Sequence, residues 1–436
     1  MTTKLEDDFQ KKNSHSLFKT VRELEDKPRK NVPAMKGADG KRTTNPTEVL
    51  EIWRKHFKNH LNTEFPRDEQ ALTTLGNDLP AHTDDEFSIS KDDITKAIAA
   101  LKNNKAPGSD SITPEVLKAG GDTVVNMLKI IFDKILNSTD TPTHFAKMIV
   151  TPIFKKGDRE NPANYRAIAL LSIPGKVLNR ILLQHIQEKT EQVTSDRQYG
   201  FRPNRGTTDA IFVVRQLMQK SKERNLNLHY HFIDFKSAFD TIWRQALWRM
   251  MARIGVNKTV IEVIKNMYEK SQCTVNVDGK MTDWFEVTVG VRQGCLLSPT
   301  LFNLFLEFVM DELQDLQNSA SFNDQLCIDV RYADDTTFIA AIFEKLQLST
   351  NQLQEACNKY GMKINASKCK AITASPISIS ISNNNVETVQ DFIFLGSNVP
   401  STSADIKRRI SLANIAFGRL KQNIWSRRDV SIALKI

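Results

Sequence analysis

The sequence predicts a mixed α/β protein, of the α+β kind, and three observations support this. From about residue 86 onward, helical and strand-like patterns alternate, separated by turns rich in Gly, Pro and Asn. Two long apolar stretches, 124–136 and 298–313, have the spacing of buried helices. Two β-rich segments, 228–234 and 327–341, each carry aspartate where a strand should end or turn.

Composition narrows the class of protein. The chain has 436 residues, enough for two to four domains with their own cores, and 60 Lys and Arg against 51 Asp and Glu give a net charge of +9, which favours a polyanionic partner. The 5 cysteines include no CxxC pair, so we expect neither a disulfide framework nor a zinc knuckle, and we expect a reducing compartment. Neither an apolar leader nor a membrane-spanning run is present, which predicts a soluble intracellular protein.

Residues 1–85 are charged and poor in large apolar side chains, so we expect an extension or linker with one amphipathic helix at 46–61. The apolar face of that helix comprises Val49, Leu50, Ile52, Trp53, Phe57 and Leu61. His56 and His60 share the helix at a spacing that zinc sites use, but no third ligand accompanies them. We therefore interpret them as surface residues.

The first segment that delivers an acid is LHYHFID, residues 228–234. Strand alternation places Tyr230, Phe232 and Asp234 on one face, with Asp234 at the end of the strand. A helix is expected just after it, ending near Gly255.

The second segment is CIDVRYADDTTFIAA, residues 327–341. The chain is expected to reverse at Ala333, Asp334 and Asp335 and to return as the partner strand, which puts the acids at the tip of a hairpin. In the helix before this hairpin, Ser298 is the predicted N-cap and Pro299 the first helical residue.

Aspartates at a strand end and at a nearby hairpin tip can converge on one point. Like charges so placed raise each other's pKa at a cost of several kcal/mol unless a cation lies between them. Oxygen ligands without His or Cys favour Mg²⁺, for which Mn²⁺ can substitute, and two such ions about 4 Å apart suit nucleotidyl transfer. An Asp-Asp pair alone is common at turns for conformational reasons, so it is weak evidence by itself.

Ordered segments elsewhere strengthen this hypothesis. They are KAPGSDSITPEVLK (105–118), IVTPIFKKGDRENPANYRAIALLS (149–172), QYGFRPNRGTTDAI (198–211), FIDFKSAFDTI (232–242), GVRQGCLLSPTLFNLFLE (290–307), RYADD (331–335), YGMKINASKCK (360–370) and FIFLGSNV (392–399). In content and order they resemble the reverse transcriptases of the non-LTR (LINE-type) retrotransposon class, over a stretch from about residue 94 to the C-terminus.

The resemblance implies roles for the acids. Asp234 and Asp334 would be the principal metal ligands, Asp335 would lie next to them with a less direct role, and the backbone carbonyl of Phe235 would complete one metal shell. Lys368 matches a proposed general acid for the pyrophosphate, although Lys363 and Lys370 are close in sequence.

The resemblance also implies a nucleotide site. Phe239 would exclude a 2′-hydroxyl, Gln293 and Gly294 would lie against the nucleotide, and Lys155 and Arg166 would clamp the triphosphate. Read without the family, these residues are a core phenylalanine, a generic loop and a solvated turn.

The fold that the resemblance implies is a right-hand polymerase. Fingers from about 86 to 225 would interleave with an antiparallel palm sheet to about 400, backed by helices, and residues 401–436 would begin a helical thumb. The implied substrates are an RNA template, a DNA primer and dNTPs, with action in the nucleus, the cytoplasm or both. Eight Lys or Arg against two Asp between Asp405 and Ile436 would contact backbone phosphates.

Three features qualify this expectation. Ala167 stands where the class usually has proline, which would loosen the fingers hairpin slightly. The sequence also lacks the usual upstream endonuclease domain and ends early in the expected thumb, so we expect a truncated chain. A catalytically idle remnant that only binds nucleic acid is thus the alternative. A Mg²⁺-dependent phosphohydrolase would leave the nucleotide-site residues without a shared purpose, and no P-loop motif occurs.

Overall fold

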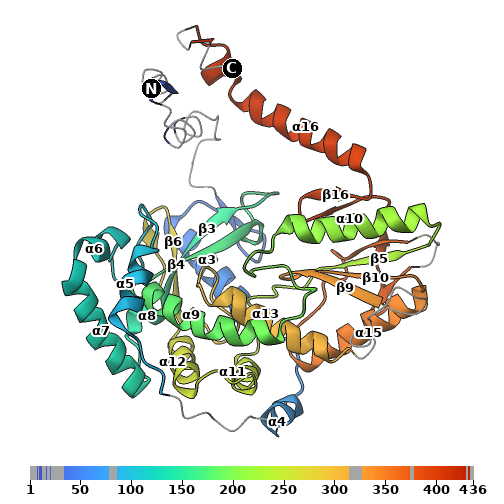
Figure 1. Cartoon of the computed structure of the whole chain (residues 1–436). Helices are drawn as coiled ribbons and strands as arrows, with labels where there is room; N and C mark the ends of the chain where they lie inside the picture. Colours follow the sequence, from blue (N-terminus) through green and yellow to red (C-terminus); the bar gives the residue numbers. More distant parts are fainter. Residues whose placement is uncertain are drawn as a thin grey trace. The chain divides into compact units, whose positions relative to one another are not determined.

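The computed structural model describes residues 34–77, 86–313, 327–373 and 378–428, with 431–432 and positions 7, 9–11, 16 and 20 (Figure 1). Contacts divide the chain into a larger unit, Pro33–Gln390, and a smaller unit made of Met1–Val32 and Asp391–Ile436. Most of 1–33 and all of 78–85, which belong to the predicted extension, lie outside the described residues. The predicted boundaries at 85 and 400 stay predictions.

The first five-stranded sheet of the larger unit contains both acid-bearing segments. Its strand order is β14-β11-β5-β10-β9, antiparallel except for the β11–β14 pair. The strands are β5 (His229–Ile233), β9 (Cys327–Tyr332), β10 (Asp335–Ala340), β11 (Lys370–Ile372) and β14 (Glu387–Thr388). The predicted strand before Asp234 and the predicted hairpin are confirmed.

The second sheet is built around the β3–β4 hairpin. Its order is β4-β3-β6-β7 with β8 also on β6, and only β3 and β6 run parallel. The strands are β3 (Lys147–Phe154), β4 (Tyr165–Leu171), β6 (Gln272–Val277), β7 (Lys280–Met281) and β8 (Phe285–Glu286). The ladder between β3 and β4 continues through Pro152 opposite Ala167, so the hairpin forms with alanine at that position.

Short pairings and helices complete the larger unit. The pairings are β1 (Met35–Lys36) with β2 (Arg42–Thr43) and β12 (Ser380–Ile381) with β13 (Asn384–Asn385). The helices are α3 (Pro46–His60), α4 (Gln70–Asn77), α5 (Lys91–Ala99), α6 (Pro114–Ala119), α7 (Gly121–Ser138), α8 (Thr143–Ala146), the 3₁₀ turn η1 (Pro162–Asn164), α9 (Ile173–Val193), α10 (Thr207–Glu223), α11 (Arg244–Arg253), α12 (Lys258–Glu269), α13 (Ser298–Asp311) and α15 (Phe343–Lys359).

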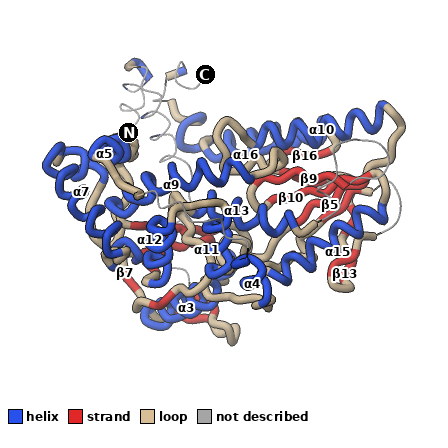
Figure 2. Tube along the Cα trace, turned by 60° about the horizontal axis from the view of Figure 1, so that its bottom comes forward, coloured by secondary structure: helices blue, strands red, loops and turns tan. Residues whose placement is uncertain are grey.

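Helices enclose the first sheet on two sides. Helix α10 contacts β9, while α15 contacts β5 and β10, and both views show the sheet between these two helices (Figures 1 and 2). Helix α13 contacts α9, α11 and α15, and nearly all of its side chains are buried. All five residues of β5 are buried for the same reason, so both of its faces are packed.

The amphipathic helix predicted near the N-terminus is confirmed as α3. Asn45 caps it, and Val49, Trp53 and Phe57 are buried. The helix packs against β6, and the Trp53 ring meets the Tyr165 ring edge-on at 4.8 Å. This segment is therefore part of the core of the larger unit.

Two predicted helix starts are wrong. Ser298 is the first residue of α13 and not its cap, because its hydroxyl donates instead to the carbonyl oxygen of Arg292 at 2.7 Å. The helix expected directly after Asp234 begins only at Arg244, since Ser237 adopts a left-handed backbone (φ 52°) and the intervening residues form turns.

The smaller unit is described over a β-hairpin and a long helix. Its elements are β15 (Phe392–Phe394), β16 (Ser397–Val399), α16 (Thr402–Arg419) and the π-helical turn η2 (Lys421–Trp425). Asp405 accepts from the amide of Asn398 at 2.8 Å and from Arg409 at 2.9 Å, which lowers its pKa to about 2 and ties α16 to β16.

None of the helices in the described parts of the chain is both long and apolar enough to cross a bilayer.

Candidate active site

The structure brings Asp234, Asp334 and Asp335 together; we call these three residues the acidic cluster. Thr336 of β10 pairs with Ile233 of β5, so continuing the antiparallel register by one step sets Asp335 opposite Asp234. Asp334 occupies the turn between β9 and β10. The negative charge of Asp234 reaches both neighbours and raises their pKa values.

The turn that carries Asp334 is fixed from behind by residues 198–200. Ala333 has a left-handed backbone (φ 56°), and the Gln198 Oε1 atom accepts from the amides of Ala333 at 2.9 Å and Gly200 at 2.8 Å. Gly200 lies so close that a Cβ atom there would be 2.2 Å from the Ala333 nitrogen. Only glycine fits at this position, and the turn geometry depends on it.

A buried ion pair holds the strand that leads into the turn. The Arg331 guanidinium on β9 donates to both carboxylate oxygens of Glu307 on α13, at 3.0 and 3.2 Å, and both side chains are buried. The backbone of Arg331 also bonds with Arg197 and Tyr199. Bidentate pairing adds geometric specificity, so β9 is fixed on α13.

The electrostatics of the acidic cluster are unfavourable when all three groups are ionised. Burial first, and then the charge of Asp234, raise the pKa of Asp334, while Arg166 and Lys368 oppose the rise. Burial and the charges of Asp334 and Asp234 raise the pKa of Asp335 to about 6. A cation among these carboxylates would lower the repulsion between them.

The donor set suits a hard divalent cation. All three side chains supply carboxylate oxygens, and the buried Oδ2 of Asp234 makes no hydrogen bond, although the Nζ of Lys368 lies 3.4 Å from it. Within the described residues, however, no three Asp, Glu, His or Cys side chains are arranged as a ready metal site. The predicted ligand roles of Asp234, Asp334, Asp335 and the Phe235 carbonyl therefore stay predictions.

The raised pKa of Asp335 predicts a stabilising substitution. Since its folded pKa lies above the unfolded value, the ionised group destabilises the fold at pH 7.5, and this effect fades as pH falls through about 6 toward 4. We expect Asp335→Asn to raise Tm by about 1–2 °C at pH 7.5, with a smaller gain at pH 5. Calorimetry of this variant beside Asp278→Asn, in the β6–β7 turn, tests it; a lower Tm at pH 7.5 would contradict the assignment.

Among the three lysines considered for the general acid, Lys368 lies next to the acidic cluster. Its Nζ is 3.4 Å from Oδ2 of Asp234. Lys370 pairs with Glu387, and Lys363 lies over the ring of Phe65. This contact favours Lys368 for the role.

The loop carrying Lys368 is attached to the end of β5 by its backbone. The amide of Asn365 donates to the carbonyl oxygen of Asp234, and the amide of Lys236 donates to that of Lys363, each at 2.8 Å. These two bonds leave the Phe235 carbonyl uninvolved.

Lys155 and Arg166 come from the β3–β4 hairpin. Arg166 is paired with Ile153, and the Lys155 amide donates to the Asn164 carbonyl at 2.8 Å. Burial first, then the charges of Arg166 and Lys368, lower the pKa of Lys155. Three cations thus lie within electrostatic reach of one another beside the acidic cluster, an arrangement that suits a polyphosphate.

Gln293 and Gly294 form a turn packed on β4. Gly294 has φ 90°, and a Cβ atom there would lie 2.9 Å from the Ala169 carbonyl oxygen. Gly294 thus allows a close approach to β4, and its predicted place against the nucleotide stays a prediction. Gln293 donates through Nε2 to both carboxylate oxygens of Asp240, each at 3.1 Å.

Phe239 is half-buried among aromatic rings. It stacks on Phe302 with 4.2 Å between centroids and meets Phe201 edge-on at 6.2 Å. It lies in the turns after β5 and not in a helix. The contacts fit both readings of this residue, so its sugar-selecting role stays a prediction.

Sequence reasoning missed Gln198, Asp240 and His60. His60 was interpreted as a surface residue, yet its Nε2 lies 3.2 Å from Oδ2 of the buried Asp240. His56, stacked on His60 with 6.0 Å between rings, has its pKa lowered to about 4 by burial and by His60. An acid inside the apolar run AFDTIW was the signal that could have revealed Asp240.

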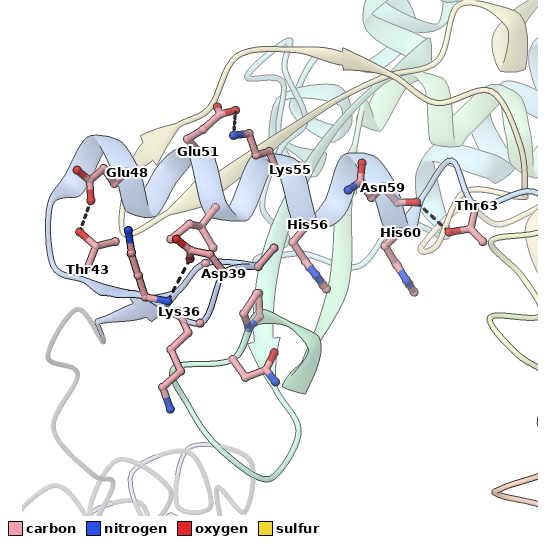
Figure 3. Close-up of a pocket in the computed structure, with 17 residues that line it drawn as sticks. Lys36, Asp39, Thr43, Glu48, Glu51, Lys55, His56, Asn59, His60 and Thr63 are labelled. Carbon is pink, nitrogen blue, oxygen red and sulfur yellow. Dashed lines mark hydrogen bonds and ion pairs between the residues drawn. The ribbon is translucent and has the colours of Figure 1, made fainter.

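A groove of about 1060 Å³ lies between the β1–β2 hairpin, α3 and η1. His56 and His60 point the same way from α3 at one end of it (Figure 3). No member of the acidic cluster lines this groove, so we do not assign the active site to it despite its size.

The comparisons with known proteins identify the family of the chain. The model of the family described as reverse transcriptase (RNA-dependent DNA polymerase) matches residues 153–399, which include the acidic cluster, Arg166, Lys155, Phe239, Gln293 and Lys368. The chain belongs to this reverse transcriptase family, and its relatives are non-LTR retrotransposon proteins.

Three relatives illustrate the extent of the similarity. The RNA-directed DNA polymerase from mobile element jockey of Drosophila melanogaster is 23% identical over 97% of this chain and 48% of that protein. The Retrovirus-related Pol polyprotein from the type-2 retrotransposable element R2DM of the same species is 25% identical over 65% of this chain and 26% of that protein. The Transposon TX1 uncharacterized 149 kDa protein of Xenopus laevis is 23% identical over 80% and 27%. The chain thus spans about half or less of these relatives.

Proposed function

We propose that the chain is an RNA-directed DNA polymerase that extends the 3′-hydroxyl of a primer with dNTPs. The observation that carries this proposal is the convergence of Asp234 and Asp334 beside the cations Lys155, Arg166 and Lys368. Paired carboxylates next to clustered cations match a reaction in which a hydroxyl attacks an α-phosphate and pyrophosphate departs.

The fold supports a right-hand arrangement. In this proposal, the sheet containing β5, β9, β10 and β11 is the palm, the β3–β4 hairpin belongs to the fingers, and α16 begins the thumb. The similarity to the RNA-directed DNA polymerase from mobile element jockey of Drosophila melanogaster extends over 97% of this chain.

The acids are proposed to hold divalent cations, through Asp234, Asp334 and the Phe235 carbonyl, with Asp335 adjacent. Bound Mg²⁺ would supply Lewis-acid activation of the hydroxyl and stabilise the leaving group. The raised pKa values of Asp334 and Asp335 support the need for positive charge at this point.

The cations are proposed to act on the triphosphate. Lys155 and Arg166 would neutralise its charge and orient it, while Lys368 would transfer a proton from Nζ to the departing pyrophosphate oxygen. Gln293 would contact the incoming nucleotide at the turn beside β4.

A primer-extension assay tests the proposal. Purified chain is incubated with a 5′-labelled DNA primer annealed to RNA, dNTPs and Mg²⁺, and elongated products are resolved on a gel. Template-dependent extension supports the polymerase. Binding of the primed template without extension supports the catalytically idle remnant, and release of phosphate from dNTPs without extension would indicate a phosphohydrolase.

The proposed position of Phe239 predicts that the protein discriminates between deoxyribonucleotides and ribonucleotides. If its ring fills the space of a 2′-hydroxyl, Phe239→Val should raise the efficiency of ribonucleotide incorporation by about tenfold, while dNTP incorporation changes little. Single-nucleotide kcat/KM values for a dNTP and its matching NTP measure this. Phe201→Leu, which alters a neighbouring ring of the same aromatic group, is the control; equal changes for both nucleotides in the Phe239 variant would assign the ring to packing alone.

A further inference from the structure

We propose that Asp240 is a positioning residue that fixes the side chain of Gln293 for the incoming nucleotide and links it to the N-terminal helix through His60. The proposal rests on the polymerase function above. Three side chains from distant parts of the sequence meet here: Gln293 donates to both oxygens of Asp240 at 3.1 Å, and His60 lies 3.2 Å from Oδ2.

The direction of the Gln293 amide follows from the chemistry of its partner. An ionised carboxylate can only accept hydrogen bonds, so it holds the NH₂ group of Gln293 toward itself. The carbonyl Oε1 is then directed away from Asp240 as an acceptor. Asp240 thereby makes Gln293 complementary to a donor group on the nucleotide, such as a sugar hydroxyl or a base amine.

The surroundings keep this pair rigid. Asp240 is buried, and with Gln293 it borders a gap of only about 20 Å³. The other walls include the apolar side chains Leu61, Val150 and Val291, together with Arg244 and Arg292. Hydrogen bonds are stronger in a buried place such as this than in water. A flip of the Gln293 amide would direct Oε1 at a carboxylate, which the charge of Asp240 disfavours.

Backbone hydrogen bonds also fix the position of Asp240. The amide of Val291 donates to Phe239 at 2.8 Å and that of Gly290 donates to Ile242 at 2.9 Å, so residues 239–242 and 290–291 are laced together. A Cβ atom on Gly290 would lie 2.4 Å from the Asp240 carbonyl oxygen. The distance between Asp240 and Gln293 is therefore set by the fold.

Asp240 also affects Lys155, one of the two cations proposed to bind the triphosphate. Its charge raises the pKa of Lys155, against the lowering by burial, Arg166 and Lys368. The Asp240 carboxylate thus interacts with Lys155 of the β3–β4 hairpin, with Gln293, and with His60 of α3. The buried acid therefore has a role in the segment that also contributes Phe239.

The test compares nucleotide KM and kcat in single and double variants. Asp240→Asn should raise the dNTP KM by about tenfold, the size expected when a charged hydrogen-bond acceptor is lost, with kcat changed by less than about twofold. In a Gln293→Met background the same substitution should add less than about twofold, because residues acting through one another are not additive. His60→Ala should raise KM by about threefold. Asn59→Ala, at an exposed position of the same helix, should leave KM unchanged.

The outcomes separate this inference from the polymerase proposal. The inference alone is overturned if the wild-type chain extends primers and Asp240→Asn leaves KM unchanged. It is also overturned if Asp240→Asn adds its full effect on KM in the Gln293→Met background. If Asp240→Asn fails to fold, His60→Ala decides: a KM increase confined to the wild-type background supports the inference, and an increase in both or neither overturns it. If the chain binds dNTPs without extending primers, dNTP Kd replaces KM; binding of neither dNTP nor primed template overturns both proposals.

Discussion

Asp334→Asn should reduce primer extension by about 10³-fold or more, the scale of loss seen when a reaction loses an essential charged group. Asparagine keeps the size of the side chain and its place in the turn held by Gln198. It removes the negative charge that the proposed cations require, so the loss should appear in kcat. Binding of the primed template should be unchanged or slightly tighter, because one negative charge near the phosphates is removed.

Two measurements make this result specific. Single-turnover extension measures the chemical step, and a filter-binding titration of the primed template measures binding of the substrate. Asp278→Asn, the same change in the β6–β7 turn, is the control and should keep full activity. Retention of more than about one tenth of kcat in Asp334→Asn would remove this residue from the metal site.

Gly200→Ala should destabilise the larger unit by about 2–4 kcal/mol. The added methyl would lie 2.2 Å from the Ala333 nitrogen and 2.9 Å from the Tyr332 carbonyl carbon, and backbone atoms in a paired hairpin cannot move aside as a side chain can. The strain falls on the turn that carries Asp334. We therefore expect residual folded protein to lose extension activity as well.

Urea denaturation measures the change in the free energy of unfolding. Gly206→Ala is the matched control, since a Cβ atom there would meet nothing nearer than 3.8 Å and its φ of −141° suits any residue. This variant should be within about 1 kcal/mol of wild type. Equal stability of the two alanine variants would mean that the 198–200 segment does not press on the turn.

Local sequence patterns were sufficient to place the residues of the acidic cluster at strand ends. Strand alternation ends at Asp234, and two β-rich runs flank Asp334 and Asp335. All three acids could therefore be assigned to the end of a strand or the tip of a hairpin. Family resemblance supplied the proximity of the two segments, which no local pattern contains.

The residues that hold this site in place could not be predicted in the same way. Gln198 supports the turn at Ala333 from 135 positions away, and the Asp240 carboxylate meets Gln293 at a separation of 53 residues. Such contacts depend on how whole elements pack, and a single sequence carries no signal of that packing. The delayed start of α11 was missed for a related reason, since Ser237 takes a left-handed backbone that its residue type does not announce.

The packing of α3 has a practical consequence for dissecting this protein. A recombinant fragment starting at residue 86 would lack α3, which packs against β6 and buries Trp53 and Phe57. It would also lack the Asn62 bonds to Glu286 and Thr288 and the His60 contact with Asp240. The uncovered strand would present apolar area to solvent and favour aggregation. Fragments for expression should therefore begin upstream of the β1–β2 hairpin.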